Sequence, residues 1–503
     1  MTDTAIYSIV QIFNNNVKAN FVSPWKMGGR HHCTGTGFCV EVKDRLYILT
    51  NYHVIEGNTM LQVQRYSDHK KYQASVVYDA KECDLALLDI GDQEFWDNIE
   101  PVEVINKLPE MSEDVYVIGY PLGGENLSIT KGVVSRIMDA VYSSSECVKN
   151  LVIQIDAAIN SGNSGGPVIN SDGEVIGIGF QGPDHKIAEN MGEIIPIDVY
   201  ENIFLRNFLN NPKTTLDGLC ALGLDTQPIE NKALAQYLKI GDRTGIMVNG
   251  VWAFSNLHGI VQKNDVILEV DGHQILSDET YKINDDCRIN YEYLINKKLP
   301  GEKIVLKILR DGEEMTVESK AEAIVPSIRY PINDIPNDYV IIGGMVFLTF
   351  NYMYFKQIQK DKKHHISPYF VSLITNAYDI KEEVVILSSI LAHPVNAGYR
   401  AREYKDCSLQ KFNDVKVTSL RHLLTLVREA RESGAKFYKF EFGQISSDMS
   451  SINKIIVIDA EKSREANSQI LKQNKIQNDT SFDVGSIESE NSTYNLRSKV
   501  KTK

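Results

Sequence analysis

Residues 162–167 of this chain read Gly-Asn-Ser-Gly-Gly-Pro, a short run that combines a nucleophilic side chain with a flexible backbone. A serine hydroxyl becomes an effective nucleophile when a neighbouring base removes its proton. Attack on a carbonyl carbon places negative charge on oxygen, and backbone N–H groups at a tight turn stabilise that charge. Gly162 and Gly165 permit such a turn because they lack a Cβ atom. Taken alone, a run of this kind is more often a glycine-rich β-turn than a nucleophile.

Short apolar runs separated by turn residues surround this serine, from residue 35 to residue 197. Residues 35–42 alternate between apolar and polar side chains, which is typical of a half-buried strand. Residues 170–173, Asn-Ser-Asp-Gly, lie between two such runs and predict a β-hairpin. Many short strands at this spacing predict a β-rich region of one or two small barrels or a sandwich.

Two further motifs in this region supply a candidate base and a candidate acid. His53 lies at the end of a strand-like run, and Asp84 opens another run. Singly, such a histidine is more often a satisfied structural residue, and such an aspartate is more often a strand-end cap. Together with Ser164 they follow the order His, Asp, Ser, which matches the chymotrypsin-like arrangement and differs from the orders of α/β-hydrolases and subtilisins. A buried aspartate bonded to a histidine fixes the imidazole tautomer that accepts the serine proton.

These motifs and their surroundings resemble those of the HtrA/DegP (Deg) serine proteases. In the β-rich region the resemblance is carried by residues 34–38, 49–54, 84–86, 154–160 and 162–167. Three further segments resemble the plant-type branch of that family: residues 23–25, 179–182 and 392–399. The similarity therefore extends over roughly residues 4–475.

The resemblance implies a mainly β chain, in which a chymotrypsin-like double β-barrel protease domain precedes two α+β PDZ-like domains. Residues 196–211 change to a helical period before Pro212, so we expect the protease domain to cover residues 1–212. We expect a PDZ domain at residues 213–325 and a second, degenerate PDZ-like domain at residues 326–473. Residues 474–503 lose apolar periodicity and are rich in Asn, Ser and Lys, so we expect a disordered tail there.

The resemblance also assigns roles to individual residues of the β-rich region. It implies that Ser164 is the nucleophile, His53 the general base and Asp84 the acid that orients the base. It further implies an oxyanion hole formed by the backbone N–H groups of Gly162, Asn163 and Ser164.

Residues 221–224, Ala-Leu-Gly-Leu, resemble the loop at which a PDZ domain receives a peptide C-terminus. The resemblance implies that the backbone N–H groups of Leu222, Gly223 and Leu224 bind the terminal carboxylate while the peptide adds as a strand to a sheet edge. By itself the tetrapeptide fits an ordinary strand start equally well. In the third region, residues 339–347 predict one apolar strand and residues 419–431 a helix, both interpreted as packing elements rather than a ligand site.

The composition is that of an ordinary globular protein, and it narrows the range of partners. The chain has 503 residues, 43% of them hydrophobic and 24% charged, and its formal net charge is −13, from 53 basic and 66 acidic residues. Such a net acidic chain is a poor general binder of phosphate backbones, so we expect no nucleic-acid partner. The sequence contains no run of eighteen apolar residues and no GxxxxGK[ST], HExxH or paired Cys/His spacing. We therefore expect no membrane span, no metal and no cofactor.

The cysteines and the first residues bear on location. The seven cysteines are widely spaced and form no CxxC pair, which favours a reduced compartment over a disulfide framework. The first residues resemble neither a signal peptide nor a transit peptide. We therefore expect a cytoplasmic or nuclear protein.

Together these features predict an ATP-independent serine endopeptidase that cleaves unfolded or exposed protein segments through an acyl-enzyme, as in protein quality control. The resemblance also implies a homo-oligomer built on trimers through aromatic residues near the N-terminus. Phe13 and Phe21 are candidates for this contact, although core packing explains them equally well. The alternative function is a protease-fold chaperone or peptide-binding scaffold with little or no turnover, because an intact set of three side chains does not guarantee an ordered active site.

Overall fold

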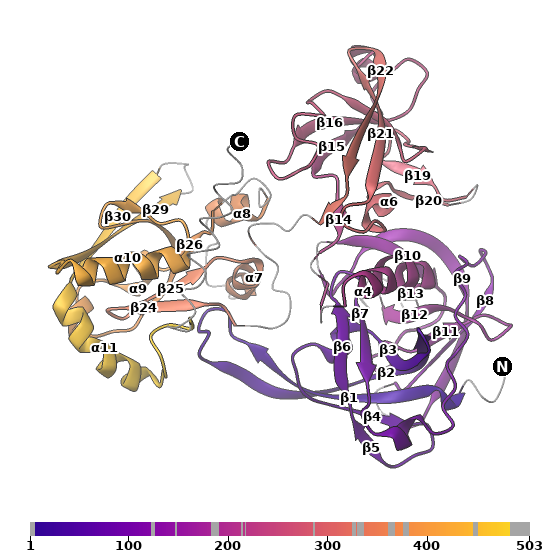
Figure 1. The fold of residues 1–503 in the computed structure, drawn as a ribbon, viewed down its shortest axis with the longest axis horizontal. Helices are drawn as coiled ribbons and strands as arrows, with labels where there is room; N and C mark the ends of the chain where they lie inside the picture. Colours follow the sequence, from indigo (N-terminus) through magenta and orange to yellow (C-terminus); the bar gives the residue numbers. More distant parts are fainter. Residues whose placement is uncertain are drawn as a thin grey trace. The chain divides into compact units, whose positions relative to one another are not determined.

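The computed structural model describes residues 6–121, 126–145, 148–182, 191–212, 215–216, 218–284, 287–323, 328, 336–360, 368–375, 382–445 and 451–482. The chain is mainly β, as the sequence predicts, and it divides into two compact units (Figure 1). Unit 1 contains Met1–Val17 and Arg30–Val325, and unit 2 contains Lys18–Gly29 and Pro326–Lys503.

The first sheet of unit 1 has seven strands in the order β5-β4-β1-β2-β3-β7-β6. Apolar side chains that alternate along these strands, among them Ile12, Ile48 and Leu88, form its buried core. The strands are β1 (Ile9–Ala19), β2 (Met27–Val42), β3 (Arg45–Thr50), β4 (Asn58–Arg65), β5 (Lys71–Gln73), β6 (Ser75–Ala80) and β7 (Leu85–Asp89). The short helices α2 (Tyr52–Ile55) and η1 (Gln93–Trp96) follow β3 and β7.

The second sheet of unit 1 is a closed barrel in the order β10-β13-β12-β11-β8-β9. Its strands are β8 (Asp114–Gly119), β9 (Ser128–Val141), β10 (Lys149–Ile155), β11 (Pro167–Ile169), β12 (Val175–Gln181) and β13 (Gly192–Pro196). A helical stretch follows where the sequence predicts one, made of α3 (Ile197–Val199), the π-helical η2 (Tyr200–Leu205) and α4 (Arg206–Asn210). The segment that carries Ser164 leads directly into β11, so the barrel wall anchors it.

The remainder of unit 1 is an α+β region built on a sheet with the order β15-β16-β17-β21-β22, in which β18 also pairs with β17. Its strands are β15 (Leu224–Pro228), β16 (Ile246–Val251), β17 (Val266–Val270), β18 (His273–Gln274), β21 (Lys303–Arg310) and β22 (Glu313–Lys320). Two small strand pairs accompany the sheet, β14 (Cys220–Ala221) with β23 (Glu322–Ala323) and β19 (Thr280–Lys282) with β20 (Arg288–Asn290). The helices are α5 (Lys232–Tyr237) and α6 (Glu292–Asn296).

Unit 2 is also α+β, with the sheet order β24-β25-β26-β27-β29-β30 and β28 paired to β27. The strands are β24 (Tyr339–Ile342), β25 (Met345–Thr349), β26 (Val385–Ile390), β27 (Cys407–Phe412), β28 (Val415–Lys416), β29 (Phe437–Ile445) and β30 (Ser451–Asp459). The helices are α7 (Tyr352–Lys360), α8 (Pro368–Thr375), η4 (Pro394–Asn396), α9 (Ala401–Tyr404), α10 (Leu420–Glu432) and α11 (Ala460–Asn474). The helix predicted at residues 419–431 is thus present as α10.

The single strand predicted at residues 339–347 is a hairpin instead, formed by β24 and β25. Gly343 and Gly344 turn the chain with φ angles of 56° and 85°. Glycine adopts such conformations without the steric cost of a Cβ atom, so an apolar run that reads as one strand folds back on itself at this pair.

The predicted tail begins too early. Residues 475–482 belong to the folded part of unit 2, because Ile476 and Phe482 are only 6% and 8% exposed. Two apolar side chains among polar neighbours are too few to produce a periodic signal, yet they are enough to hold this segment on the sheet. The rest of the predicted tail, residues 483–503, lies outside the described residues.

Phe21 packs in the core of unit 2 rather than on an exposed surface. It is 4% exposed, its N–H donates to Gln357 Oε1 at 2.8 Å, and its carbonyl accepts from Asn337 Nδ2 at 2.9 Å. Nearby, the Trp25 ring meets the Tyr339 ring edge to face, with centroids 5.5 Å apart. Core packing is therefore the role of Phe21 in this structure.

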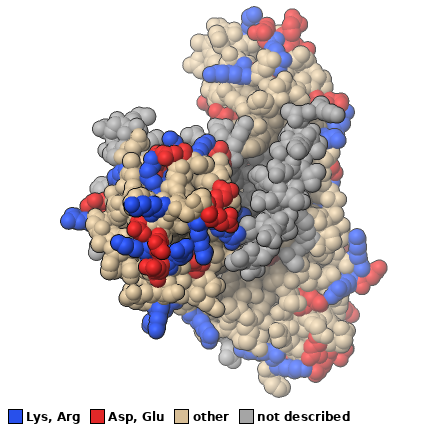
Figure 2. Space-filling model, turned by 60° about the vertical axis from the view of Figure 1, so that its left-hand side comes forward, with Lys and Arg blue, Asp and Glu red and all other residues tan. Residues whose placement is uncertain are grey.

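Charged side chains of both signs lie intermixed on the face shown in Figure 2. In unit 2, for example, Lys439 Nζ lies 2.6 Å from Asp414 and 2.7 Å from Glu441. None of the helices in the described ranges is long and apolar enough to cross a membrane.

Candidate active site

His53 and Asp84 come together where two neighbouring strands of the first sheet meet their loops. β3 ends at Thr50, which lies opposite Ala86 in β7, so the residues that flank these positions are close in space. His53 lies in α2, just after β3, and Asp84 lies just before β7. His53 Nδ1 lies 2.6 Å from Asp84 Oδ2, and the backbone N–H of His53 donates to Asp84 Oδ1 at 3.0 Å.

Asp84 is held by its backbone as well as by its side chain. The residue is fully buried, and its φ of 50° lies in the left-handed region, which strains a residue that has a Cβ atom. Its carbonyl oxygen accepts hydrogen bonds from Asn51 Nδ2 at 3.1 Å and from Tyr52 N at 3.0 Å. Because an ionised carboxylate only accepts hydrogen bonds, Nδ1 of His53 carries the proton and Nε2 is the nitrogen available to act as a base.

The carboxylate of Asp84 governs the acid–base behaviour of His53. One third of the His53 side chain (33%) is exposed, whereas the side chain of Asp84 is completely covered. Burial by itself lowers the pKa of His53, but the charge of Asp84, the hydrogen bond to it and the charge of Glu56 together raise that pKa above its ordinary value. This environment stabilises the imidazolium ion that forms when a histidine accepts a proton.

Ser164 lies on the closed barrel, in the segment between β10 and β11. It is half-buried, and its Oγ donates to the carbonyl oxygen of Phe180 at 3.2 Å. The ring of Phe180 is 6.4 Å from the ring of His53, measured between centroids. Within the described part of the chain, Ser164 Oγ makes this bond to Phe180 and none to His53. Ser164 and His53 therefore both lie near Phe180, and the Ser164 hydroxyl is directed toward the Phe180 carbonyl.

The backbone around Ser164 forms a tight turn whose N–H groups are unequally available. The N–H of Asn163 donates to Asn160 O at 2.9 Å. Among the described residues, the N–H groups of Gly162 and Ser164 have no hydrogen-bond partner. The expectation that Asn163 supplies an oxyanion-hole donor does not hold in this structure, because its N–H already closes the turn. Gly162 and Ser164 keep N–H groups that are free to bind an oxyanion.

Thr36 binds this turn from the first sheet, a role that the sequence reading missed. The residue is fully buried, its N–H donates to Ser164 O at 2.9 Å, and its Oγ1 donates to Gly162 O at 2.7 Å. Oγ1 also accepts from Tyr120 N at 2.9 Å, and the Thr36 carbonyl accepts from Thr50 Oγ1 at 2.7 Å. The sequence shows Thr36 only as a polar residue at the start of an apolar run. It does not show the partners of Thr36, because they lie far away in the sequence.

The neighbouring cysteine is protonated, and the described residues form no metal site. Burial raises the pKa of the Cys83 thiol well above its ordinary value, so this neighbour of Asp84 stays protonated and unreactive. In the described part of the chain, no group of His, Cys, Asp or Glu side chains has the arrangement of a metal site.

The loop at residues 221–224 lies at the start of an edge strand. β15 is the first strand in its sheet order, so one side of it is unpaired within that sheet. The carbonyl of Leu222 accepts from Ser255 Oγ at 2.6 Å, and the carbonyl of Gly223, whose φ is 65°, accepts from Trp252 N at 2.9 Å. The N–H groups of Leu222 and Gly223 have no hydrogen-bond partner among the residues that the structure describes. Leu224 lies opposite Val251 of β16 in a non-hydrogen-bonded pair, because the adjacent bond runs from Trp252 N to Gly223 O, so the Leu224 N–H points away from β16.

Comparison with known proteins identifies two domain families. A model of the trypsin-like peptidase domain matches residues 35–178, and a model of a PDZ domain matches residues 328–483. "Putative protease Do-like 3, mitochondrial" of Arabidopsis thaliana is 34% identical over 507 residues, which cover 100% of this chain and 83% of that relative. "Protease Do-like 2, chloroplastic" of the same plant is 33% identical over 484 residues, 95% of this chain and 75% of the relative. A solved structure, the HtrA-type protease AlgW with a tripeptide, has a TM-score of 0.50 at 21% identity and covers 65% of this chain and 96% of its own.

The same relatives correct the expected location. Do-like 3, Do-like 4 and Do-like 12 are named as mitochondrial and Do-like 2 as chloroplastic, which points to an organelle. The expectation of a cytoplasmic or nuclear protein is therefore wrong. Unpaired cysteines indicate a reducing environment, and that property does not distinguish the cytosol from other reducing compartments.

Proposed function

Because the chain belongs to the Do-like (Deg/HtrA) family of serine proteases, we propose that His53, Asp84 and Ser164 are its catalytic triad. The chain is a serine endopeptidase. The observation that most supports this assignment is that both carboxylate oxygens of Asp84 bind His53. Oδ2 lies 2.6 Å from His53 Nδ1, and Oδ1 accepts from the His53 backbone N–H at 3.0 Å. An aspartate in this position orients the imidazole and stabilises its protonated form.

The reaction is acyl transfer from the substrate to Ser164 and then to water. Rotation about χ1 releases Ser164 Oγ from Phe180 and turns it to His53 Nε2, which takes the proton as Oγ attacks the scissile carbonyl. The N–H groups of Gly162 and Ser164 bind the oxyanion of the tetrahedral intermediate. His53 then protonates the leaving amine, and water hydrolyses the acyl-enzyme by the same route.

The substrates in this proposal are unfolded or extended protein segments, cleaved without ATP. An extended segment suits such a protease because its backbone is free to pair with a strand edge. The peptide C-terminus adds beside β15 with its carboxylate at the N–H groups of Leu222, Gly223 and Leu224, for which no hydrogen-bond partner is present among the described residues. The proposal also includes a trimer-based homo-oligomer, which rests on the family resemblance. It also keeps the domain limits 1–212 and 213–325, and it extends the third domain, which begins at residue 326, to residue 482.

The test is labelling with a serine-directed fluorophosphonate, followed by peptide mapping. We expect one labelled residue, Ser164, and loss of labelling in both Ser164→Ala and His53→Ala. Ser161→Ala is the matched control, because Ser161 is an exposed serine of the same loop and its loss leaves labelling intact. Wild-type protein that is not labelled but still suppresses aggregation of an unfolded client would instead support the scaffold function. The hydrogen bond from Ser164 Oγ to Phe180 O is compatible with such an inactive state of the serine.

A further inference from the structure

A row of polar side chains crosses neighbouring strands of the closed barrel. Gln154 of β10 lies opposite Arg136 of β9. Glu193 of β13 lies opposite Gln154 on one side and opposite Gln181 of β12 on the other, in strands that are labelled in Figure 1. Residues directly opposite each other in an antiparallel pair project from the same face of the sheet, close enough for their side chains to interact. We call these four residues the Glu193 row.

Glu193 is a buried carboxylate without a basic partner. The residue is 8% exposed, and its Oε2 accepts a hydrogen bond from Gln181 Nε2 at 2.7 Å. No Lys, Arg or His side chain in the ranges that the structure describes forms an ion pair with Glu193, and Arg136 at the end of the row is exposed. Removing a carboxylate from water is costly, and a neutral amide offsets that cost less well than a cation does. A cation brought next to Glu193 would therefore be stabilised.

Gln154 contributes a second acceptor that lacks a donor. The residue is 6% exposed, and its Oε1 is covered and has no hydrogen-bond partner. The hydroxyl of Tyr142 does not supply one, because it donates to Leu151 O at 2.7 Å. Burial raises the pKa of Tyr142 well above its ordinary value, and the charges of Asp84 and Glu193 contribute to this rise, so the Tyr142 hydroxyl lies close to both carboxylates. The row thus presents unmet acceptors on the side of the barrel where Asp84 lies.

The row ends beside the proposed nucleophile. Phe180 precedes Gln181 in β12, and its carbonyl oxygen accepts from Ser164 Oγ at 3.2 Å. The pairing of β11 with β12 ends at Ile178, so this end of β12 is no longer paired with β11. When Ser164 Oγ turns to His53 in the proposed mechanism, the Phe180 carbonyl becomes free to accept from the backbone N–H of an extended substrate. The substrate residues that precede the scissile bond then pass next to Gln181.

We propose that the Glu193 row is a substrate subsite that selects a lysine or arginine side chain shortly before the scissile bond. This inference rests on the proposed function, because it places the substrate by means of Ser164. An ammonium or guanidinium group carries several N–H donors and a positive charge, which match the Glu193 carboxylate and Gln154 Oε1. The apolar stem of such a side chain can lie across Gln181 while its charged end reaches Glu193. Unfolded segments with a basic residue at this position are cleaved in preference to other segments.

Cleavage of matched peptides by the full chain tests this proposal. The peptides are neutral, quenched fluorogenic substrates of one sequence, with lysine or uncharged Nε-acetyl-lysine placed in turn at the second, third and fourth residue before the scissile bond. At one of these positions we expect kcat/KM for lysine to exceed that for acetyl-lysine by about tenfold or more. Glu193→Gln should bring the two values together, because the neutral side chain no longer attracts the cation. Cuts mapped by mass spectrometry in a reduced, unfolded protein give the same comparison if short peptides are cleaved too slowly.

The matched control is Glu174→Gln, in a residue that directly precedes the other end of β12. Glu174 Oε2 also accepts from a neighbouring amide, Asn170 Nδ2, at 2.8 Å, so the substitution is chemically the same. This variant should keep the preference for lysine. If Glu193→Gln fails to fold, Gln181→Lys serves instead, because it gives Glu193 a cation within the chain and should also abolish the preference.

Fluorophosphonate labelling separates failure of the subsite from failure of the proposed function. Parent protein that is labelled at Ser164 but cleaves the lysine and acetyl-lysine peptides equally at all three positions overturns the subsite alone. A preference for lysine that persists in folded, labelled Glu193→Gln protein also overturns it, because other residues then make the selection. Parent protein that is not labelled overturns the proposed function and the subsite together.

Discussion

At the scale of single residues, Asp84 shows how one side chain is positioned by several independent contacts. Its backbone is strained, its carbonyl is bound by Asn51 and Tyr52, and both carboxylate oxygens meet His53. A strained, fully buried carboxylate persists only where its surroundings hold it, and such residues gather at functional sites. The position of the Asp84 carboxylate therefore depends on several separate contacts, and conservative substitutions can remove them one at a time.

Ser164→Ala should lower kcat on the order of a millionfold, the loss measured when a comparable triad loses its nucleophile. His53→Ala should cause a similar loss, and the double variant should lose little more, because base and nucleophile act as one unit. Hydrolysis of an unfolded protein substrate by the two single variants and the double variant measures this. Losses that simply multiply would contradict the proposed partnership.

Asp84→Asn should lower the rate about 10⁴-fold and change its dependence on pH. In the parent protein the pKa of His53 is raised, so activity should be lost as pH falls through a value above 6.5, where His53 becomes protonated and can no longer accept a proton. Replacing the carboxylate removes the charge that holds this proton, so the acid limb of the kcat/KM profile should move to lower pH. A limb that stays in place would show that another group titrates.

Thr36→Val keeps the shape of the side chain and removes the hydroxyl that holds Gly162 O and accepts from Tyr120 N. We expect kcat to fall about 10- to 100-fold, or ~1.4–2.7 kcal/mol, because the oxyanion donors of the loop lose their fixed position. KM should change little, since those donors act mainly in the transition state. Thr36→Ser retains the hydroxyl and should retain most of the activity. A change confined to KM would mean that Thr36 acts on substrate binding instead.

At the scale of secondary-structure elements, a pair of glycines decides where one strand ends, and a buried asparagine stabilises the resulting turn. Gly343 and Gly344 divide an apolar run into β24 and β25, and Asn396, in η4, ties this turn to the end of β26. Asn396 is 3% exposed, and its Nδ2 donates to Gly343 O and to Leu391 O, each at 2.8 Å. The segment at residues 392–399, which carries part of the family resemblance, thus contributes a structural bond to this hairpin.

Asn396→Ala should destabilise unit 2, because it leaves two carbonyl groups without their shared donor in a buried place. The expected cost is about 1–3 kcal/mol for each group left unsatisfied. Gln473→Ala, at an exposed position of α11, is the control and should be nearly neutral. Calorimetry of both variants measures the effect; equal melting temperatures would mean that water replaces the amide at no cost.

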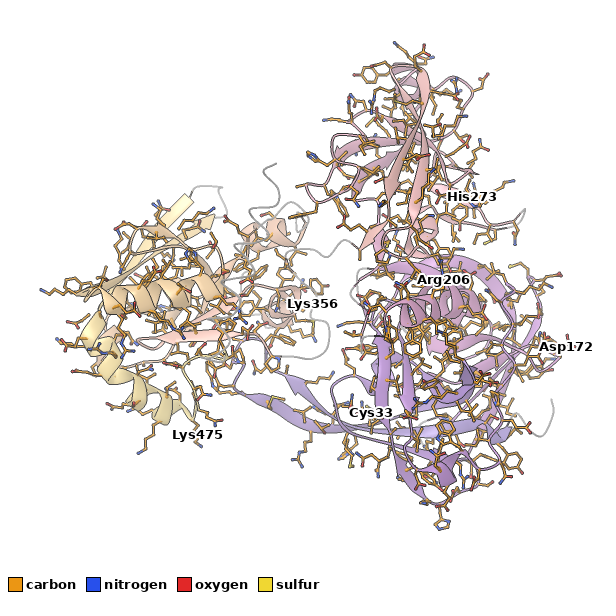
Figure 3. The ribbon with its side chains drawn as sticks, in the orientation of Figure 1. Cys33, Asp172, Arg206, His273, Lys356 and Lys475 are labelled. Carbon is orange, nitrogen blue, oxygen red and sulfur yellow. The ribbon has the colours of Figure 1, made fainter. Side chains whose placement is uncertain are left out.

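At the scale of the whole molecule, polar contacts connect the parts of unit 1. Arg206, labelled in Figure 3, lies in α4 beyond the closed barrel, where its guanidinium binds Glu302 at 2.6 Å and Lys297 O at 2.8 Å. The Tyr293 hydroxyl donates to the carboxylate of Asp198 in α3. Burial raises the pKa of Tyr293 well above its ordinary value, so this hydroxyl remains a donor at neutral pH. The α6 region, which carries Tyr293, is thereby fixed to the end of the barrel.

Tyr293→Phe should loosen this connection, because a hydrogen bond to a charged carboxylate contributes about 1.5–3 kcal/mol. We expect the apparent Tm of unit 1 to fall by about 2–6 °C. Tyr237→Phe makes the same chemical change at a side chain that is 71% exposed, and its Tm should match that of the parent. If the two variants melted alike, the Asp198 contact would contribute nothing to stability.

The sequence by itself determined the family, the mainly β fold class and the serine endopeptidase activity. These follow from short contiguous motifs, since chemistry and turns both constrain neighbouring residues. The motifs also predicted that His53, Asp84 and Ser164 act together. The structure places the Asp84 carboxylate in contact with His53.

Only the tertiary structure decided the contacts between distant parts of the chain. It shows that the Asn163 N–H is already engaged, that Thr36 holds the Ser164 turn, that Phe21 packs in unit 2 and that residues 479–481 pair with β24. The physical reason is that the partner of an edge strand or a buried amide depends on which segments meet in space, whereas periodicity and motifs report only on neighbours in the chain.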